Sequence, residues 1–140
     1  MTLLDTDHLS VLHYPESAAY ASLRTRLEAA GQESFATTVV SVEEQLRGWL
    51  AYLGRFREVH KQVPAYERLV KLFLFLSPWE IIIFDTRAAD MFQHLRKQRV
   101  RIGTQDLKIA AIALVHNARL LSANLRDFQQ VPALQVENWL

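Results

Sequence analysis

The sequence predicts an α/β domain built on a mostly parallel central sheet with helices on both faces. Short apolar or β-branched runs at about 2–5, 35–40, 80–84 and 119–122 alternate with longer segments of helical pattern. Such alternation is typical of parallel strands joined by helical crossovers. The 140 residues suffice for one domain with its own core, and no repeat, linker or low-complexity segment divides them. We therefore expect a single domain over 1–140.

The composition excludes several classes of protein. Half of the residues are hydrophobic and 22% are charged, as in ordinary globular proteins. Cysteine is absent, which excludes disulfides and thiolate chemistry. The longest apolar run has seven residues, against ~20 for a membrane span, and the N-terminus lacks a cationic leader. We expect a cytoplasmic protein with no membrane segment. Because the net charge is only +1, any basic surface must be local.

The first third of the chain predicts two strands and a helix. Residues 2–5 form a short apolar run that ends on an acid, and they predict a buried strand whose carboxyl end delivers Asp5. Residues 17–30 predict a helix, with a serine as its cap and a glycine as its stop. Residues 35–40 are rich in β-forming side chains and predict the second strand.

Two long helices follow and predict a hairpin that projects from the sheet. Ser41 and Glu44 match the S-x-x-E capping box, in which the acid reaches back to the serine backbone. The second helix, from about 56 to 76, contains Pro64, which we expect to bend or interrupt it. The connection between the two helices is short, so they should be neighbours.

The rest of the chain returns to alternating strands and helices. Asp85 is expected to cap a helix that runs to about residue 97, and Thr104 to cap an apolar helix that is buried on nearly every face. Strands are predicted at 80–84, 119–122 and 134–137, the last of them at an edge of the sheet.

Three acids share one relation to this pattern. Asp5 ends the first strand, Glu44 lies in the first turn after the second, and Asp106 lies at the head of the buried helix before the fourth. Strand ends and the following helix starts meet at one edge of a parallel sheet, so the three side chains can converge. Each acid alone also fits an ordinary helix start or turn. Their coincidence favours a shared cation, and oxygen ligands without cysteine or clustered histidine indicate Mg²⁺ or Mn²⁺. Such a site activates water for phosphodiester hydrolysis.

Four motifs in fixed order carry a resemblance to a known family. They are LLDTDHLS at 3–10, S-x-x-E-x-x-x-G at 41–48, IGTQDLKIAA at 102–111 and LSANLRDF at 121–128, and VPALQVENW at 131–139 fits the same pattern. Together they resemble the PIN-domain nucleases, and most closely the VapC-like toxins of bacterial toxin–antitoxin pairs. The resemblance spans essentially the full chain.

The resemblance implies a PIN-like fold and a metal-dependent endoribonuclease that acts on RNA as a homodimer. It also implies a cognate antitoxin that threads a segment across the helical hairpin and blocks the acidic site. Carried over position by position, Asp5, Glu44 and Asp106 match the family's catalytic, metal-binding acids, with Mg²⁺ or Mn²⁺ as the cofactor. The E-x-x-x-G spacing selects Glu44 over the adjacent Glu43.

One position departs from the family pattern. PIN nucleases often have a fourth acid after the last core strand, and this chain has Asn124 there, with Asp127 three residues later. Asn124 can still orient a ligand or water through its amide. Thr6 and Ser122 can hydrogen-bond a carboxylate or phosphate oxygen, although hydroxyls near strand ends are commonly structural. Of the histidines, only His8 is near the acids, and we interpret it as a helix-face residue.

Two further groups of side chains are candidates for binding. A cluster of four cations just before the Asp106 helix fits RNA phosphates, and it also fits a solvated charged face. Aromatic side chains on the predicted hairpin fit a groove for a partner, although most of the aromatics there should be core. The two groups are Arg96, Lys97, Arg99 and Arg101 for RNA, and Trp49, Tyr52 and Phe56 for the partner groove.

Two alternative functions remain open. Asp5-Thr6-Asp7 is similar to the D-x-D start of haloacid-dehalogenase-type phosphatases, in which Asp5 would be the nucleophile and Asp7 the acid–base. Leu9 departs from that family's Thr or Val, and no late acidic pair with a suitably placed lysine follows. The other alternative, suggested by the missing fourth acid, is a non-catalytic binding protein that keeps the PIN fold.

Overall fold

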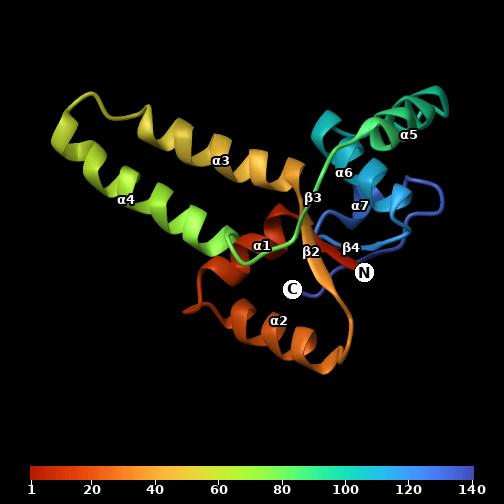
Figure 1. The fold of residues 1–140 in the computed structure, drawn as a ribbon, viewed down its shortest axis with the longest axis horizontal. Coiled ribbons are helices and arrows are strands. Elements are labelled where there is room, and N and C mark those ends of the chain that lie inside the picture. The colour runs from red at the N-terminus through yellow and green to blue at the C-terminus, as the bar shows by residue number, and fades with distance from the viewer.

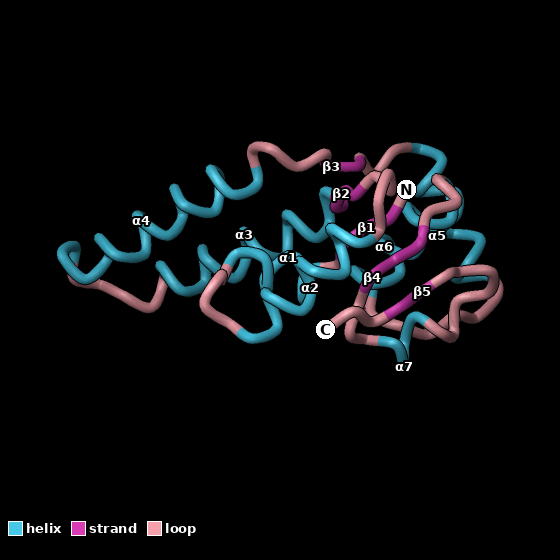
Figure 2. Tube along the Cα trace, turned by 90° about the horizontal axis from the view of Figure 1, so that it is seen from below, coloured by secondary structure: helices cyan, strands magenta, loops and turns pink.

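The computed structural model describes residues 1–140 (Figure 1). It contains a five-stranded sheet in the order β3-β2-β1-β4-β5, which can be followed in Figure 2. Every neighbouring pair of strands is parallel, and central β1 aligns its Leu4 with Thr37 of β2 and Leu121 of β4. All five carboxyl ends therefore lie at one edge of the sheet. The predicted parallel α/β fold is confirmed.

The elements follow one another in the order that the sequence predicts, with an additional helix directly after β1 and a short one after β4. The strands are β1 (Thr2–Leu4), β2 (Phe35–Thr38), β3 (Ile81–Ile82), β4 (Arg119–Leu121) and β5 (Val136–Glu137). The helices are α1 (Thr6–His13), α2 (Ala18–Ala29), α3 (Val39–Leu53), α4 (Val59–Leu76), α5 (Thr86–Lys97), α6 (Thr104–Val115) and α7 (Leu125–Phe128).

Both faces of the sheet are covered, as the apolar strands require. Successive side chains of a strand point to opposite faces. Leu3 accordingly packs in the main core with α5 and α6, whereas Leu4 packs with Leu23 of α2 and with Trp139. Helix α6 is buried along most of its length, and this explains its almost continuous apolar sequence. No helix is long and apolar enough to cross a membrane.

The predicted helical hairpin is confirmed and consists of α3 and α4, which extend together away from the sheet (Figures 1 and 2). Pro64 was expected to bend or interrupt this helix. It lies inside α4 and does not interrupt it. The proline nitrogen cannot donate to the carbonyl of His60. His60 is exposed, so water can satisfy that carbonyl.

Two predicted helix caps are wrong, and two are confirmed. The side chain of Thr38, not that of Ser41, caps α3: its Oγ1 accepts a hydrogen bond from the Ser41 backbone N–H at 3.0 Å. Helix α3 thus begins before Ser41, and Glu44 lies beyond its first turn, away from the cap. Helix α6 begins after Gly103 and has no side-chain cap, so Thr104 is already helical. The caps at Ser17 and Asp85 are as predicted.

Two of the strands are also shorter than predicted. The second predicted strand, 35–40, stops at Thr38 because the cap at this residue starts α3 directly. The predicted strand at 134–137 is reduced to β5, which does lie at an edge of the sheet. These differences move no acid away from the carboxyl edge.

Replacing Thr38 with valine tests this cap. The substitution keeps the side-chain shape but removes the oxygen that accepts the Ser41 N–H, so the free energy of unfolding should fall by about 1 kcal/mol. Thr38→Ser, which keeps the hydroxyl, should lose clearly less. Denaturant unfolding measures both, and equal losses in the two variants would show that packing of the methyl group, not capping, matters here.

Candidate active site

Asp5 lies directly after β1 and is the N-cap of α1. One carboxyl oxygen accepts a hydrogen bond from the Thr6 backbone N–H at 2.7 Å, and the other accepts one from the Ser122 hydroxyl, also at 2.7 Å. The residue is only 6% exposed. Burial raises the pKa of Asp5 to about 6, and the negative charges of Asp7 and Asp106 add to the shift.

Glu44 faces the same region from α3. Its Oε1 is buried and makes no hydrogen bond. Burial raises the pKa of Glu44 to about 7, with further contributions from the charges of Asp5 and Asp106. The adjacent Glu43 is different, because it accepts a hydrogen bond from Gln105 at 2.8 Å and its pKa is lowered. These contacts support the choice of Glu44 over Glu43.

Asp106 lies in the first turn of α6, as predicted. The side-chain amide of Asn124 donates to Asp106 Oδ2 at 3.0 Å and to Asp127 Oδ2 at 3.1 Å. Burial raises the pKa of Asp106, and the charges of Asp127 and Asp7 act in the same direction. Asn124 therefore occupies the position expected for a fourth acid and bridges the carboxyl groups of Asp106 and Asp127. Asp127 is linked to Asp106 only through this amide.

The charges of Asp5 and Asp106 raise the pKa of Glu44, but the three acids do not form a ready cluster. No three Asp, Glu or His side chains are arranged so that they could hold one ion, and the role of the three acids as metal ligands stays a prediction. Asp5 is hydrogen-bonded to the Ser122 hydroxyl and Asp106 to the Asn124 amide.

The chemistry of the site nevertheless fits Mg²⁺ or Mn²⁺. Mg²⁺ commonly retains several waters and is bound through one or two carboxylates. Carboxyl oxygens are the only strong ligands here, and the buried Oε1 of Glu44 makes no hydrogen bond and no ion pair, although the Thr6 hydroxyl is near enough to lower the pKa of Glu44. Asp5, Glu44 and Asp106 are the residues that would hold such an ion, directly or through water.

The accessory hydroxyls differ in what they contact. Ser122 is fully buried and donates to Asp5, so it orients a carboxylate as expected. The hydroxyl of Thr6 is buried without a hydrogen-bond partner. Ser122 is thus tied to the acids, whereas Thr6 presents an unused polar group close to them.

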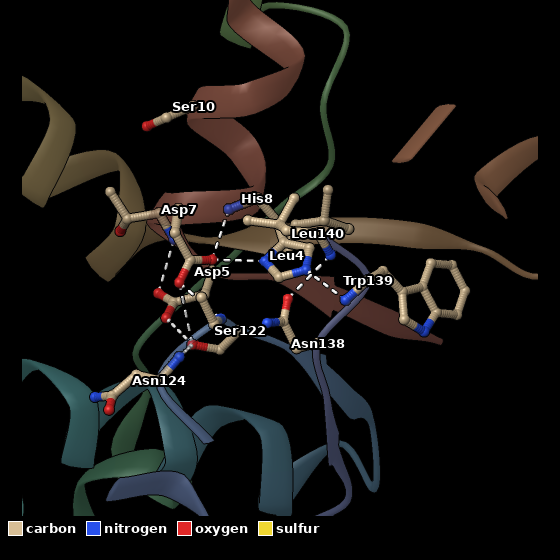
Figure 3. Close-up of polar contacts among 12 residues, drawn as sticks. Leu4, Asp5, Asp7, His8, Ser10, Ser122, Asn124, Asn138, Trp139 and Leu140 are labelled. Carbon is tan, nitrogen blue, oxygen red and sulfur yellow. Dashed lines mark hydrogen bonds and ion pairs between the residues drawn. The ribbon is translucent and has the colours of Figure 1, made fainter. Parts of the chain in front are cut away.

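His8 is a functional neighbour that the sequence interpretation missed. It is 0% exposed, and its ring contacts Asp7 on one side and the backbone N–H of Trp139 on the other (Figure 3). Asp7 in turn accepts hydrogen bonds on both carboxyl oxygens. Burial opposes the ionisation of Asp7, but hydrogen bonds from His8 and Ala123 lower its pKa overall. A group held ionised in this way is unsuited to general acid catalysis, which argues against the phosphatase alternative.

A groove of about 420 Å³ begins beside the acids and follows the hairpin. Thr6 of α1 lines it at the acidic end, Trp49 and Tyr52 line it from α3, and Arg68 lines it from α4. The Arg68 guanidinium lies 5.6 Å from the centre of the Trp49 ring and 5.5 Å from that of Tyr52. Phe56 packs edge-on against Tyr52 at 5.2 Å but does not line the groove. Two of the three aromatics predicted for a partner groove therefore line it.

The four cations predicted to bind RNA lie elsewhere. They occupy the end of α5 and the loop to α6, are all exposed and form no ion pair. Arg96 stacks over Phe92, with its guanidinium 4.6 Å from the ring centre. None of the four lines the groove. The cations are Arg96, Lys97, Arg99 and Arg101.

Comparison with known proteins gives one consistent result. The family model described as PIN domain matches residues 2–134. Ribonuclease VapC2 of Rickettsia felis is 38% identical over 73 residues, which are 49% of this chain and 54% of the relative. Ribonuclease VapC2 of Haemophilus influenzae is 39% identical over 70 residues, 47% of this chain and 53% of the relative. The matches thus span about half the length of these relatives.

A solved structure extends the similarity to the whole fold. It is the crystal structure of VapBC2 from Rickettsia felis bound to a DNA fragment from their promoter. A chain of that structure is 25% identical to this one, with a TM-score of 0.72, and the alignment covers 99% of this chain and 98% of the other.

The raised pKa values predict how metal-free stability depends on pH. Glu44 ordinarily titrates at 4.5 and here at about 7, so its favourable contribution is present below about pH 4.5 and lost as the pH rises through 7. Between pH 5 and 8, stability in a chelator should fall. Glu44→Gln should remove part of this fall and be more stable than wild type at pH 8 by about 1–2 kcal/mol.

Thermal unfolding at the two pH values measures this effect. Glu43→Gln is the matched control, because the pKa of Glu43 is lowered and this carboxyl is ionised throughout the range. The control should shift stability equally at pH 5 and pH 8. A pH dependence in Glu44→Gln that equals that of wild type would show that the pKa of Glu44 is not raised in the folded protein.

Proposed function

The chain belongs to the PIN domain family, and we propose that its residues 1–140 form a metal-dependent endoribonuclease domain, the toxin of a toxin–antitoxin pair. The observation that carries the activity is the set of three carboxyl groups with raised pKa at the carboxyl edge of the sheet. The relatives named ribonuclease VapC2 support RNA as the substrate. The protein would act in the cytoplasm as a homodimer.

Each part of the site has a definite task in this proposal. A bound Mg²⁺ or Mn²⁺ would lower the pKa of a water and offset charge on the phosphodiester. Ser122 fixes the orientation of Asp5, and Asn124 fixes that of Asp106. The unpartnered oxygen of Glu44 is free to bind the ion or one of its waters. The exposed cations at the end of α5 would contact RNA phosphates.

The non-catalytic alternative rests on the missing fourth acid. Asn124 keeps that position in the hydrogen-bonded network and links Asp106 to Asp127. Burial of these acids is unfavourable for folding, as their raised pKa values indicate. A binding protein that needed no cation would gain nothing from such burial. The structure therefore favours an active site over an inactive remnant.

The antitoxin would bind in the groove along the hairpin. The groove combines aromatic rings with Arg68 and opens beside the acids at Thr6. Thr6 is the residue after Asp5, so a segment laid in the groove would end next to the acidic site. The similarity to the Rickettsia felis VapBC2 structure supports a partner of this kind.

Asp106→Asn tests the catalytic role directly. The variant keeps the side-chain size but removes one negative charge, so metal binding and RNA cleavage should fall together, by about 100-fold or more. Asp127→Asn is the matched control and should lose much less, because Asn124 separates Asp127 from Asp106. Cleavage of a purified RNA pool with Mn²⁺ measures both. Full activity in Asp106→Asn would refute the mechanism, and an inactive Asp127→Asn would assign the fourth acid to that residue.

Replacing Trp49 and Tyr52 with alanine tests the partner groove. Loss of two rings that pack against Arg68 should weaken antitoxin binding by at least about tenfold, while RNA cleavage by the free protein stays largely intact. Phe73→Ala is the control, since Phe73 is an exposed aromatic of α4 that does not line the groove. Titration calorimetry with the antitoxin gives the affinities. Unchanged affinity in the double variant would place the antitoxin elsewhere.

A further inference from the structure

We propose that Asp7 is a positioning residue that holds residues 122–124, the loop after β4, and thereby orients both Asp5 and Asp106. The inference rests on the proposed nuclease function, because its effect is read through that site. Asp7 itself contacts neither of the two acids through a hydrogen bond. It acts through the loop that does.

Asp7 joins two segments that are far apart in the sequence. Its Oδ1 accepts hydrogen bonds from the backbone N–H and the ring Nδ1 of His8, both at 2.6 Å. Its Oδ2 accepts one from the backbone N–H of Ala123 at 2.8 Å and lies 3.4 Å from the Ser122 hydroxyl (Figure 3). The carboxylate thus connects the first turn of α1 to the loop after β4. Ala123 is exposed, so little packing holds this part of the loop in place.

The ring of His8 is fixed as a donor toward Asp7. Its Nε2 lies 3.1 Å from the backbone nitrogen of Trp139, whose N–H can only donate. Nε2 must therefore accept, and in the neutral ring this places the proton on Nδ1. The segment after β5 consequently determines that Nδ1 is the ring nitrogen that donates to Asp7. The contact between Trp139 and His8 is buried, since His8 is 0% exposed and Trp139 is 6% exposed.

The loop that Asp7 holds supplies a contact to each of two acids. Ser122 donates to Asp5 at 2.7 Å, and the Asn124 side chain donates to Asp106 at 3.0 Å. The backbone N–H of Asn124 also donates to the Ser122 hydroxyl at 3.0 Å, so the two contacts belong to one small unit. Displacement of Ala123 would disturb Asp5 and Asp106 together.

An amide at position 7 would disrupt this arrangement. Both carboxyl oxygens of Asp7 face N–H donors, so an asparagine must turn its own NH₂ toward one of the two sets. In Asp7→Asn we expect the turnover number and the affinity for Mn²⁺ to fall by about 10–100-fold, as is usual when a residue that orients metal ligands is lost. The KM for RNA should stay unchanged, because Asp7 does not touch the substrate.

The experiment compares wild type, Asp7→Asn, Ser122→Ala and the double variant. RNA-pool cleavage gives the turnover number and KM, titration calorimetry with Mn²⁺ gives the affinity, and thermal unfolding gives stability. If Asp7 acts through the loop, the losses should be less than additive: the double variant should lose clearly less activity than the two single losses combined, because Ser122 belongs to the loop that Asp7 holds. Additive losses, or an Asp7→Asn that is less stable but fully active, would overturn the proposal.

Two further variants separate positioning from folding and from the proposed function. Glu33→Gln removes the negative charge that pairs with the N-terminal ammonium and with Arg119 at the opposite end of the strands, and it should lower stability without affecting Mn²⁺ affinity. His8→Gln removes the ring donor to Asp7 but keeps the backbone donor, and its amide oxygen can still accept from Trp139, so it should show a smaller loss of turnover even if Asp7→Asn fails to fold. Full turnover in His8→Gln would contradict the inference alone. A wild type that neither binds Mn²⁺ nor cleaves RNA would overturn the proposed function, and this inference with it.

Discussion

The site depends on one electrostatic constraint, the burial of like charges at the carboxyl edge of the sheet. Asp5 and Glu44 are partly removed from water, and the charge of Asp5 adds to the raised pKa of Glu44, which is unfavourable unless a proton or a cation is shared. Much of the surrounding structure offsets this cost. Ser122 and the Thr6 backbone N–H donate to Asp5, and the Asn124 amide separates the charges of two other acids. Hydrogen bonds thereby stabilise an arrangement that a divalent cation would complete.

The acids could be located from the sequence because their positions follow from the sheet. In a parallel sheet the residue after a short buried strand has only one edge to occupy, and the pairing of Leu4 with Thr37 aligns β1 and β2. The helix caps were harder to predict. Thr38 and Ser41 are three residues apart and both can cap, so the local pattern alone did not decide where α3 begins. Position in the sheet was a stronger guide than local cap chemistry.

The contacts among the acids could not be predicted in the same way. The bond between Trp139 and His8 joins residues 131 positions apart, and no spacing in the sequence indicates it. The bridging role of Asn124 likewise depends on side-chain geometry. The groove likewise forms where α1, α3 and α4 meet, and Thr6, the residue after Asp5, lines one end of it.

Titration of the protein with Mn²⁺ at about pH 6.5, in two buffers of different ionisation enthalpy, tests the central claim most directly. With pKa values of about 6 for Asp5 and about 7 for Glu44, a fraction of these carboxyl groups is protonated at that pH. A cation that binds them must displace protons. We therefore predict saturable binding whose heat depends on the buffer, with net proton release that diminishes at pH 8. Absence of binding, or binding with no proton release at pH 6.5, would contradict the claim that these buried carboxylates form a metal site.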